Sequence, residues 1–208
     1  EGVILITGPT GSGKTTTLYT CIKEINTPEN KIISIEDPVE LMIPRVNQIQ
    51  VSPDSAFDFS SALKFTLRQD PDVILLGEIR DEETANIATR AAITGHKVLS
   101  TLHTIDTITA INRLINLKVP GYQIASSLEM VLAQRLVRRI CSYCKVEYVL
   151  SESEKSIICD LLGLDNDFSS YRFSVGYGCN ACQQTGFQGR IALFEMLSLD
   201  VEMKELIS

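Results

Sequence analysis

Short apolar runs alternate with longer amphipathic segments along the first two thirds of this chain. Runs such as Val73-Ile74-Leu75-Leu76 contain no polar position, which is typical of strands that are buried on both faces of a sheet. The pattern predicts strands at 3–7, 32–36, 46–51, 73–77 and 97–102. It predicts helices at 14–25, 56–68, 82–93, 106–117 and 121–137. This alternation indicates an α/β fold, in which helices cover a mostly parallel sheet.

One predicted strand differs from the others. Residues 46–51 read Val-Asn-Gln-Ile-Gln-Val and therefore mix polar with apolar positions. A strand in the middle of a covered sheet has little room for such polar side chains. We therefore expect this strand at an exposed edge of the sheet.

The sequence changes in character after about residue 140. Two Cys-x-x-Cys pairs appear, Gly-rich segments flank the second pair, and a polar loop is expected at 165–170. We expect a helix at 152–162 and a strand that returns to the main body at 190–197. The predicted organisation is a core at 1–139, a small subdomain at 140–190, and a return to the core at 191–208.

The two ends of the chain carry a further expectation. Residue 2 leads directly into a predicted core strand, and residues 200–208 stop within an expected helix. We therefore expect a fragment of a longer protein, with the C-terminal part of the core truncated.

Residues 8–15 match the phosphate-binding pattern G-x-x-x-x-G-K-[ST], between a predicted strand and a predicted helix. In this setting backbone N–H groups and the helix N-terminus bind phosphate oxygens; the alternative is a Gly-rich turn that matches by chance. Lys14 is expected to reach the β- and γ-phosphates, and Thr15 to coordinate Mg²⁺. The residues expected to bind ATP are Gly8, Pro9, Thr10, Gly11, Ser12, Gly13, Lys14, Thr15 and Thr16.

Carboxylates follow two of the other predicted strands, at the sheet edge where ligands of α/β proteins bind. Glu78 is the candidate for activating the attacking water, and its alternative is a surface salt bridge with Arg80. An Asp usually stands at this strand end, so its replacement by Gly77-Glu78 leaves direct Mg²⁺ coordination open. Glu36 and Asp37 are candidates for holding Mg²⁺ or water, or they form a helix cap or turn.

The two histidines lie at opposite ends of one predicted strand. A six-residue strand is roughly 20 Å long, so only one of them can reach the nucleotide edge. Strand direction selects His103, which could bond to the γ-phosphate, while His96 is expected to be structural. The candidate catalytic residues are therefore Glu78, Glu36 and His103.

Cys141, Cys144, Cys179 and Cys182 form two Cys-x-x-Cys pairs, which suit tetrahedral Zn²⁺. A thioredoxin-type redox pair is one alternative, and a tetracysteine site without metal is another. Cys21 and Cys159 stand alone and are expected to be buried or inert thiols. Three arginines, at 135, 138 and 139, precede the first pair and either contact a partner or nucleotide or lie at a solvated helix end.

Composition narrows the function classes. The 208 residues include 19 basic and 26 acidic side chains, for a net charge of −7. Nucleic-acid binding begins with positive charge, so an acidic chain argues against a nucleic-acid partner. No apolar run approaches 18 residues, the length that a membrane-spanning helix needs.

In combination and order, these motifs resemble the type II/type IV secretion ATPases, in particular the assembly motors of type II secretion and type IV pili. The matching segments are a Walker A motif at 8–15, an Asp box at 35–40, a Walker B motif with Glu at 75–81, a His box at 95–104, and Gln134 to Arg138 before the tetracysteine segment.

This resemblance implies a RecA-like fold, a C-terminal ATPase domain with a zinc-binding subdomain, and a hexameric ring. It implies ATP-driven work in the cytoplasm, on a platform protein of the inner membrane. It also implies an upstream domain that supplies arginines to the nucleotide site. Glu36 and Glu78 would position metal or water and catalyse hydrolysis, and His103 would sense the γ-phosphate.

Two other function classes stay open at this stage. The first is a small-molecule P-loop kinase, although no acceptor site or lid is recognisable in the sequence. The second is a zinc-ribbon nucleic-acid-binding protein, which the net charge of −7 disfavours.

Overall fold

The computed structural model describes residues 2–52, 58–163, 168 and 170–208. The chain divides into two compact units. Residues 1–135 and 192–208 form the first, here called the core unit, and residues 136–191 form the second, here called the cysteine unit. Two long strands, β6 (Leu128–Ile140) and β9 (Phe187–Ser198), each have residues in both units.

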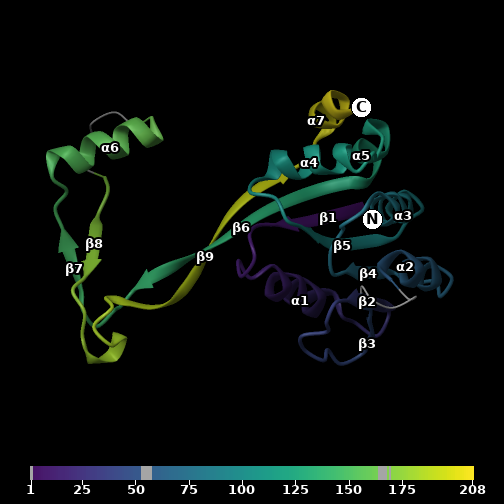
Figure 1. The fold of residues 1–208 in the computed structure, drawn as a ribbon, viewed down its shortest axis with the longest axis horizontal. Helices are drawn as coiled ribbons and strands as arrows, with labels where there is room; N and C mark the ends of the chain where they lie inside the picture. The colour runs from purple at the N-terminus through teal and green to yellow at the C-terminus, as the bar shows by residue number, and fades with distance from the viewer. Residues whose placement is uncertain (1, 53–57, 164–167, 169) are drawn as a thin grey trace. The chain divides into compact units, whose positions relative to one another are not determined.

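The elements of the core unit follow the alternation that the sequence predicts (Figure 1). Its other strands are β1 (Gly2–Thr7), β2 (Ile32–Glu36), β3 (Val46–Gln50), β4 (Val73–Leu76) and β5 (Lys97–Leu102). Its helices are α1 (Lys14–Ile25), α2 (Phe59–Leu67), α3 (Glu82–Ile93), α4 (Thr107–Asn116), α5 (Gly121–Ser127) and α7 (Val201–Ile207). The expected start of a helix at 56–57 lies outside the described residues.

The seven strands form one sheet in the order β3-β2-β4-β5-β1-β6-β9. The pairs β2–β3, β2–β4, β4–β5, β5–β1 and β1–β6 are all parallel. The predicted α/β fold with a mostly parallel sheet is therefore confirmed. β3 lies at one edge, as its mixed polar and apolar positions predict.

Successive side chains of a strand point to opposite faces of the sheet, so strands that are apolar at every position make both faces apolar. One face packs against α1, where Ile6 and Leu75 join Leu18 and Ile22 in a buried cluster. The other face carries a larger cluster that includes residues of α2, α3, α4 and α5. Burial on both faces explains why the central strands read as continuous apolar runs.

The predicted helix at 121–137 is wrong in its second half. α5 ends at Ser127, and residues 128–140 form β6, which pairs in parallel with β1 from Val3 to Thr7. Residues 128–140 contain three Leu and three Arg, which favour helices. Backbone hydrogen bonds along β1 and burial of Leu128 and Val131 override that weak propensity.

The cysteine unit contains its own small elements. β7 (Lys145–Tyr148) pairs with β8 (Phe173–Gly176) in an antiparallel ribbon. Between them lies α6 (Glu152–Leu162), and the 3-10 helix η1 (Asn180–Cys182) follows β8. α6 begins with a capping box, because Ser151 and Glu154 bond reciprocally to each other's backbone N–H groups. Most of the expected polar loop at 165–170 lies outside the described residues.

The buried sheet centre should dominate stability. Ile74 in β4 is fully buried, so we expect Ile74→Ala to lower the free energy of unfolding by about 3 kcal/mol through lost burial and a residual cavity. Ile105→Ala is the control, since that side chain is 63% exposed and its loss should cost less than about 0.5 kcal/mol. Urea denaturation of both variants would measure the difference, and equal losses would contradict this account of the core.

Candidate functional site

The phosphate loop connects β1 with α1 and is built for close approach of a ligand to its backbone. Gly8, Gly11 and Gly13 all have positive φ angles, of 146°, 76° and 89°. A Cβ at Gly8 would lie 2.3 Å from the carbonyl oxygen of Gln134, so only glycine fits there. The buried hydroxyl of Ser12 has no hydrogen-bond partner among the described residues.

The N-terminus of α1 is open to an anion. Its N-cap residue is Gly13, and no side chain caps its first N–H groups. By contrast, α2, α3 and α4 are each capped by an aspartate side chain, at Asp58, Asp81 and Asp106. Unpaired N–H groups and the positive end of the helix dipole favour phosphate at α1. The residues of this loop therefore fit a nucleotide.

Lys14 is 9% exposed and its amino group turns back onto the loop. Nζ donates hydrogen bonds to the carbonyl oxygens of Gly8 at 2.8 Å and Pro9 at 3.2 Å. Burial lowers the pKa of this amine, while the negative charge of Glu78 partly restores it. The Glu78 carboxylate, which follows β4, is therefore close enough to the phosphate loop to affect the charge of Lys14.

Glu78 follows β4 and lies between two cationic or titratable side chains. Its Oε1 forms a close ion pair with Arg80, and its Oε2 lies 3.4 Å from Nε2 of His103. The Arg80 guanidinium also lies 3.5 Å from Asp37 and over the ring of Phe59. The salt bridge with Arg80 considered from the sequence is therefore present, and it holds a carboxylate whose side chain is only 17% exposed.

Glu36 is held in a different way. It is 3% exposed, and both carboxylate oxygens accept hydrogen bonds from protein side chains. Tyr19 donates to Oε2 at 2.5 Å, while Ser34 and Gln48 donate to Oε1 at 2.6 Å and 3.2 Å. In the described part of the chain, no hydrogen bond or ion pair joins this carboxylate to Lys14 or Glu78.

The two histidines lie at opposite ends of β5. Nδ1 of His96 is bonded to the carbonyl oxygen of Ala91 at 2.9 Å, far along the strand from the phosphate loop. His103 follows the other end and meets Glu78. The next residue, Thr104, exchanges hydrogen bonds with the hydroxyl of Thr7 at the end of β1, which ties this segment to the strand before the phosphate loop.

Sequence reasoning missed several side chains that shape this edge. Tyr19 projects from α1 to Glu36, and Gln134 in β6 bonds to the phosphate loop. Tyr19 reads as an ordinary buried aromatic. Gln134 was noted as the start of the segment before the tetracysteine motif, but it was assigned to a helix and given no contact with the loop. Of the three arginines near residue 135, Arg135 donates to the carbonyl oxygen of Ile105 and Arg138 stacks 4.0 Å over the ring of Phe187. Both lie in β6 and not at a helix end.

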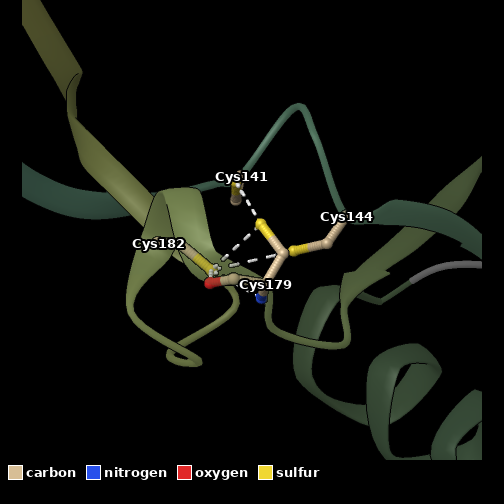
Figure 2. A group of neighbouring side chains, drawn as sticks. All are labelled: Cys141, Cys144, Cys179 and Cys182. Atoms are coloured by element: carbon tan, nitrogen blue, oxygen red, sulfur yellow. Dashed lines mark hydrogen bonds between the residues drawn. The ribbon is translucent and has the colours of Figure 1, made fainter.

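The four paired cysteines converge in the cysteine unit (Figure 2). All four sulfur atoms lie within 4.8 Å of one another. The Sγ–Sγ distances are 3.9 Å for Cys141–Cys179, 3.9 Å for Cys144–Cys182 and 3.8 Å for Cys179–Cys182. Zn–S bonds of ~2.3 Å in a tetrahedron place sulfurs about 3.8 Å apart, so this cluster fits zinc.

Backbone groups prepare Cys182 for the charged state that metal binding requires. Burial opposes its ionisation, but N–H groups of Cys179 and Gly186 donate to Sγ at 3.2 Å and 3.3 Å and lower its pKa to about 6. Burial raises the pKa of the neighbouring Cys144 thiol to about 12. Gly186 is needed at this position because a Cβ there would lie 2.2 Å from the carbonyl oxygen of Gly176.

The fold and the phosphate loop define a P-loop nucleotide-binding domain, and comparison with known proteins gives its family. The whole chain, residues 1–208, matches the family described as type II/IV secretion system protein. The chain belongs to this family.

Named relatives come from both branches of the family. The chain is 49% identical over 207 residues to the type IV pilus assembly ATPase PilB of Thermus thermophilus, covering 99% of the chain and 23% of the relative. It is 44% identical to the type II secretion system protein HxcR of Pseudomonas aeruginosa, covering 100% of the chain and 39% of the relative. The chain thus spans about a quarter to two fifths of the length of these relatives.

Solved structures show the same fold. The pilus retraction motor PilT, crystallised with ADP, aligns with a TM-score of 0.70 and 32% identity over 99% of this chain and 50% of PilT. The VirB11 ATPase of Brucella suis aligns with a TM-score of 0.53 and 26% identity over 65% of this chain and 44% of VirB11. Within the described residues, none of the helices has the length and apolar character that crossing a membrane requires.

The hydrogen bond between Tyr19 and Glu36 should stabilise the fold. Tyr19→Phe would leave a buried carboxylate short of one donor, so we expect a loss of about 1–3 kcal/mol in the free energy of unfolding. Tyr122→Phe is the matched control, because Tyr122 is 64% exposed. Chemical denaturation measures both; if Tyr19→Phe cost no more than the control, the hydroxyl would have no structural role.

Proposed function

We propose that this chain is the ATP-hydrolysing part of a motor that drives type IV pilus assembly or type II protein secretion. The observation that carries the proposal is the open phosphate loop at residues 8–15, in a chain whose relatives include a type IV pilus assembly ATPase and a type II secretion system ATPase. The structural match to PilT with bound ADP supports a nucleotide at this edge of the sheet.

The residues would divide the work as follows. Backbone N–H groups of residues 8–16 and the Lys14 amine bind phosphates, and Thr15 supplies a hydroxyl to Mg²⁺, which would neutralise developing charge when bound. Lys14 must release the carbonyl oxygens of Gly8 and Pro9 to do so. Glu78 orients and deprotonates the attacking water, and Arg80 and His103 fix the position of its carboxylate.

Glu36 has a less direct role in this proposal. Its carboxylate is occupied by Tyr19, Ser34 and Gln48, so it positions the segment that carries Asp37 and contributes to metal or water placement through that segment. His103 lies beside Glu78 and is suited to bond to the γ-phosphate.

The wider setting is also a proposal. We infer a homo-hexameric ring in the cytoplasm, held at the inner membrane by a platform protein of the pilus or secretion machine. The named relatives support this setting, since they belong to such machines. Zinc held by Cys141, Cys144, Cys179 and Cys182 would stabilise the cysteine unit, as the spacing of the sulfurs supports.

Two variants separate nucleotide binding from hydrolysis. Lys14→Ala should weaken ATP binding, while Glu78→Gln should retain binding and lose most hydrolysis, because it keeps the shape of the side chain and removes its charge. Glu83→Gln is the control, since Glu83 is an exposed partner of Lys64. ATP binding and single-turnover phosphate release, without a phosphate acceptor, measure the two steps. Parental hydrolysis by Glu78→Gln would refute its catalytic role.

Zinc content tests the cysteine cluster. Protein purified without chelator under reducing conditions should contain about one zinc per chain, and Cys144→Ser should lose it. Removal of zinc should increase amide hydrogen exchange in residues 136–191 more than in the core unit, because the four sulfurs lie in that segment. Elemental analysis that finds no metal would refute the zinc site.

A further inference from the structure

We propose that Gln134 is a positioning residue of the nucleotide site, and that its carboxamide holds the phosphate loop in the shape that binds phosphate. The proposal rests on the proposed function, because it concerns the same loop. Gln134 lies in β6 and is 3% exposed, although neither β6 nor any glutamine belongs to the phosphate-binding pattern itself.

Both polar atoms of the Gln134 side chain bond to the segment that follows β1. Nε2 donates to the carbonyl oxygen of Ser12 at 2.8 Å, and Oε1 accepts from the hydroxyl of Thr17 at 2.7 Å. The orientation of the amide follows from its partners, because a carbonyl oxygen can only accept a hydrogen bond. One side chain thus joins the phosphate loop to the first turns of α1.

The backbone of Gln134 approaches the same loop. Its carbonyl oxygen lies where a Cβ at Gly8 would come within 2.3 Å, so β6 packs directly against the first residue of the loop. Gln134 therefore meets the phosphate-loop segment at Gly8, at Ser12 and at Thr17. Of these, Ser12 and Thr17 are hydrogen-bond partners of the side chain, so both polar atoms of the carboxamide are used on this one segment.

The bond to Ser12 has a consequence for the ligand side of the loop. A trans peptide group is planar, and its C=O and N–H point in opposite directions. Fixing the carbonyl oxygen of Ser12 on Gln134 therefore fixes the direction of the Gly13 N–H, one of the donors that such a loop offers to phosphate. Gly13 is the left-handed N-cap of α1, a conformation in which the peptide group could otherwise rotate easily.

Binding of MgADP to the 208-residue chain, measured by calorimetry, tests this role. Gln134→Met keeps the length of the side chain, adds no charge and removes both bonds; we expect its affinity to fall about tenfold. Gln123→Met is the matched control, because Gln123 is also 3% exposed. Its Nε2 donates to the hydroxyl of Thr89, with a donor–acceptor distance of 2.6 Å, and neither residue belongs to the phosphate loop. The Gln123→Met variant should bind MgADP with an affinity within twofold of the parental value. Its nucleotide-free Tm should fall about as much as that of Gln134→Met.

A second pair of variants keeps the test decisive if Gln134→Met does not fold. Thr17→Val should lose several-fold in MgADP affinity, whereas Thr17→Ser should retain the parental value. The double variant Gln134→Met with Thr17→Val should lose less affinity than the two single losses combined, because both changes break the same contact. Parental affinity in Gln134→Met, or in Thr17→Val when the first variant is unfolded, overturns the proposal. A parental chain that does not bind MgADP would refute the proposed function, and this proposal with it.

Discussion

The nucleotide-binding edge depends on the backbone pairing of β1, which lies between β5 and β6 in the sheet. Both neighbours are parallel to it, so their carboxyl ends meet where the phosphate loop begins. At the end of β1 the hydroxyl of Thr7 donates to the carbonyl oxygen of Thr104, just after β5, and Gln134 reaches the loop from β6. The contacts with the segments of β5 and β6 on either side of β1 therefore help to hold the glycines of the loop at positive φ angles.

Glu36 and Glu78 carry the same carboxylate group at this edge, but their surroundings suit them to different roles. Glu36 is buried and has three side-chain donors, so little of its hydrogen-bonding capacity remains for a ligand. Glu78 is also mostly covered, but its partners Arg80 and His103 are about half exposed to solvent. A carboxylate whose partners face solvent remains accessible to a ligand, whereas one enclosed by buried donors is suited to holding structure.

Much of the fold and part of the site follow from the sequence. The apolar runs are long enough to identify buried parallel strands, and strand direction alone places His103 and not His96 beside Glu78. The assignment of β6 failed because local propensity cannot report the hydrogen bonds that β1 offers from more than 120 residues away. The contact of Gln134 with the phosphate loop was missed for the same reason, although the residue begins a segment noted in the sequence, because the contact depends on the strand in which Gln134 lies. The buried network around Glu36 was missed because Tyr19 and Gln48 carry no motif.

The position of β1 in the sheet also sets an order of events during synthesis of the protein. Thr7 bonds to a carbonyl oxygen 95 residues further along the chain, and Ser12 to a side chain 122 residues further along. At translation rates of about 5–20 residues per second, the phosphate loop is made roughly 6–25 s before the strand that completes its surroundings. Until then β1 is an apolar segment that lacks at least one of its two neighbours, β5 and β6, and contacts of such long range form slowly. The nucleotide site can therefore be completed only after β6 has been made, although its motif lies 122 residues earlier in the chain.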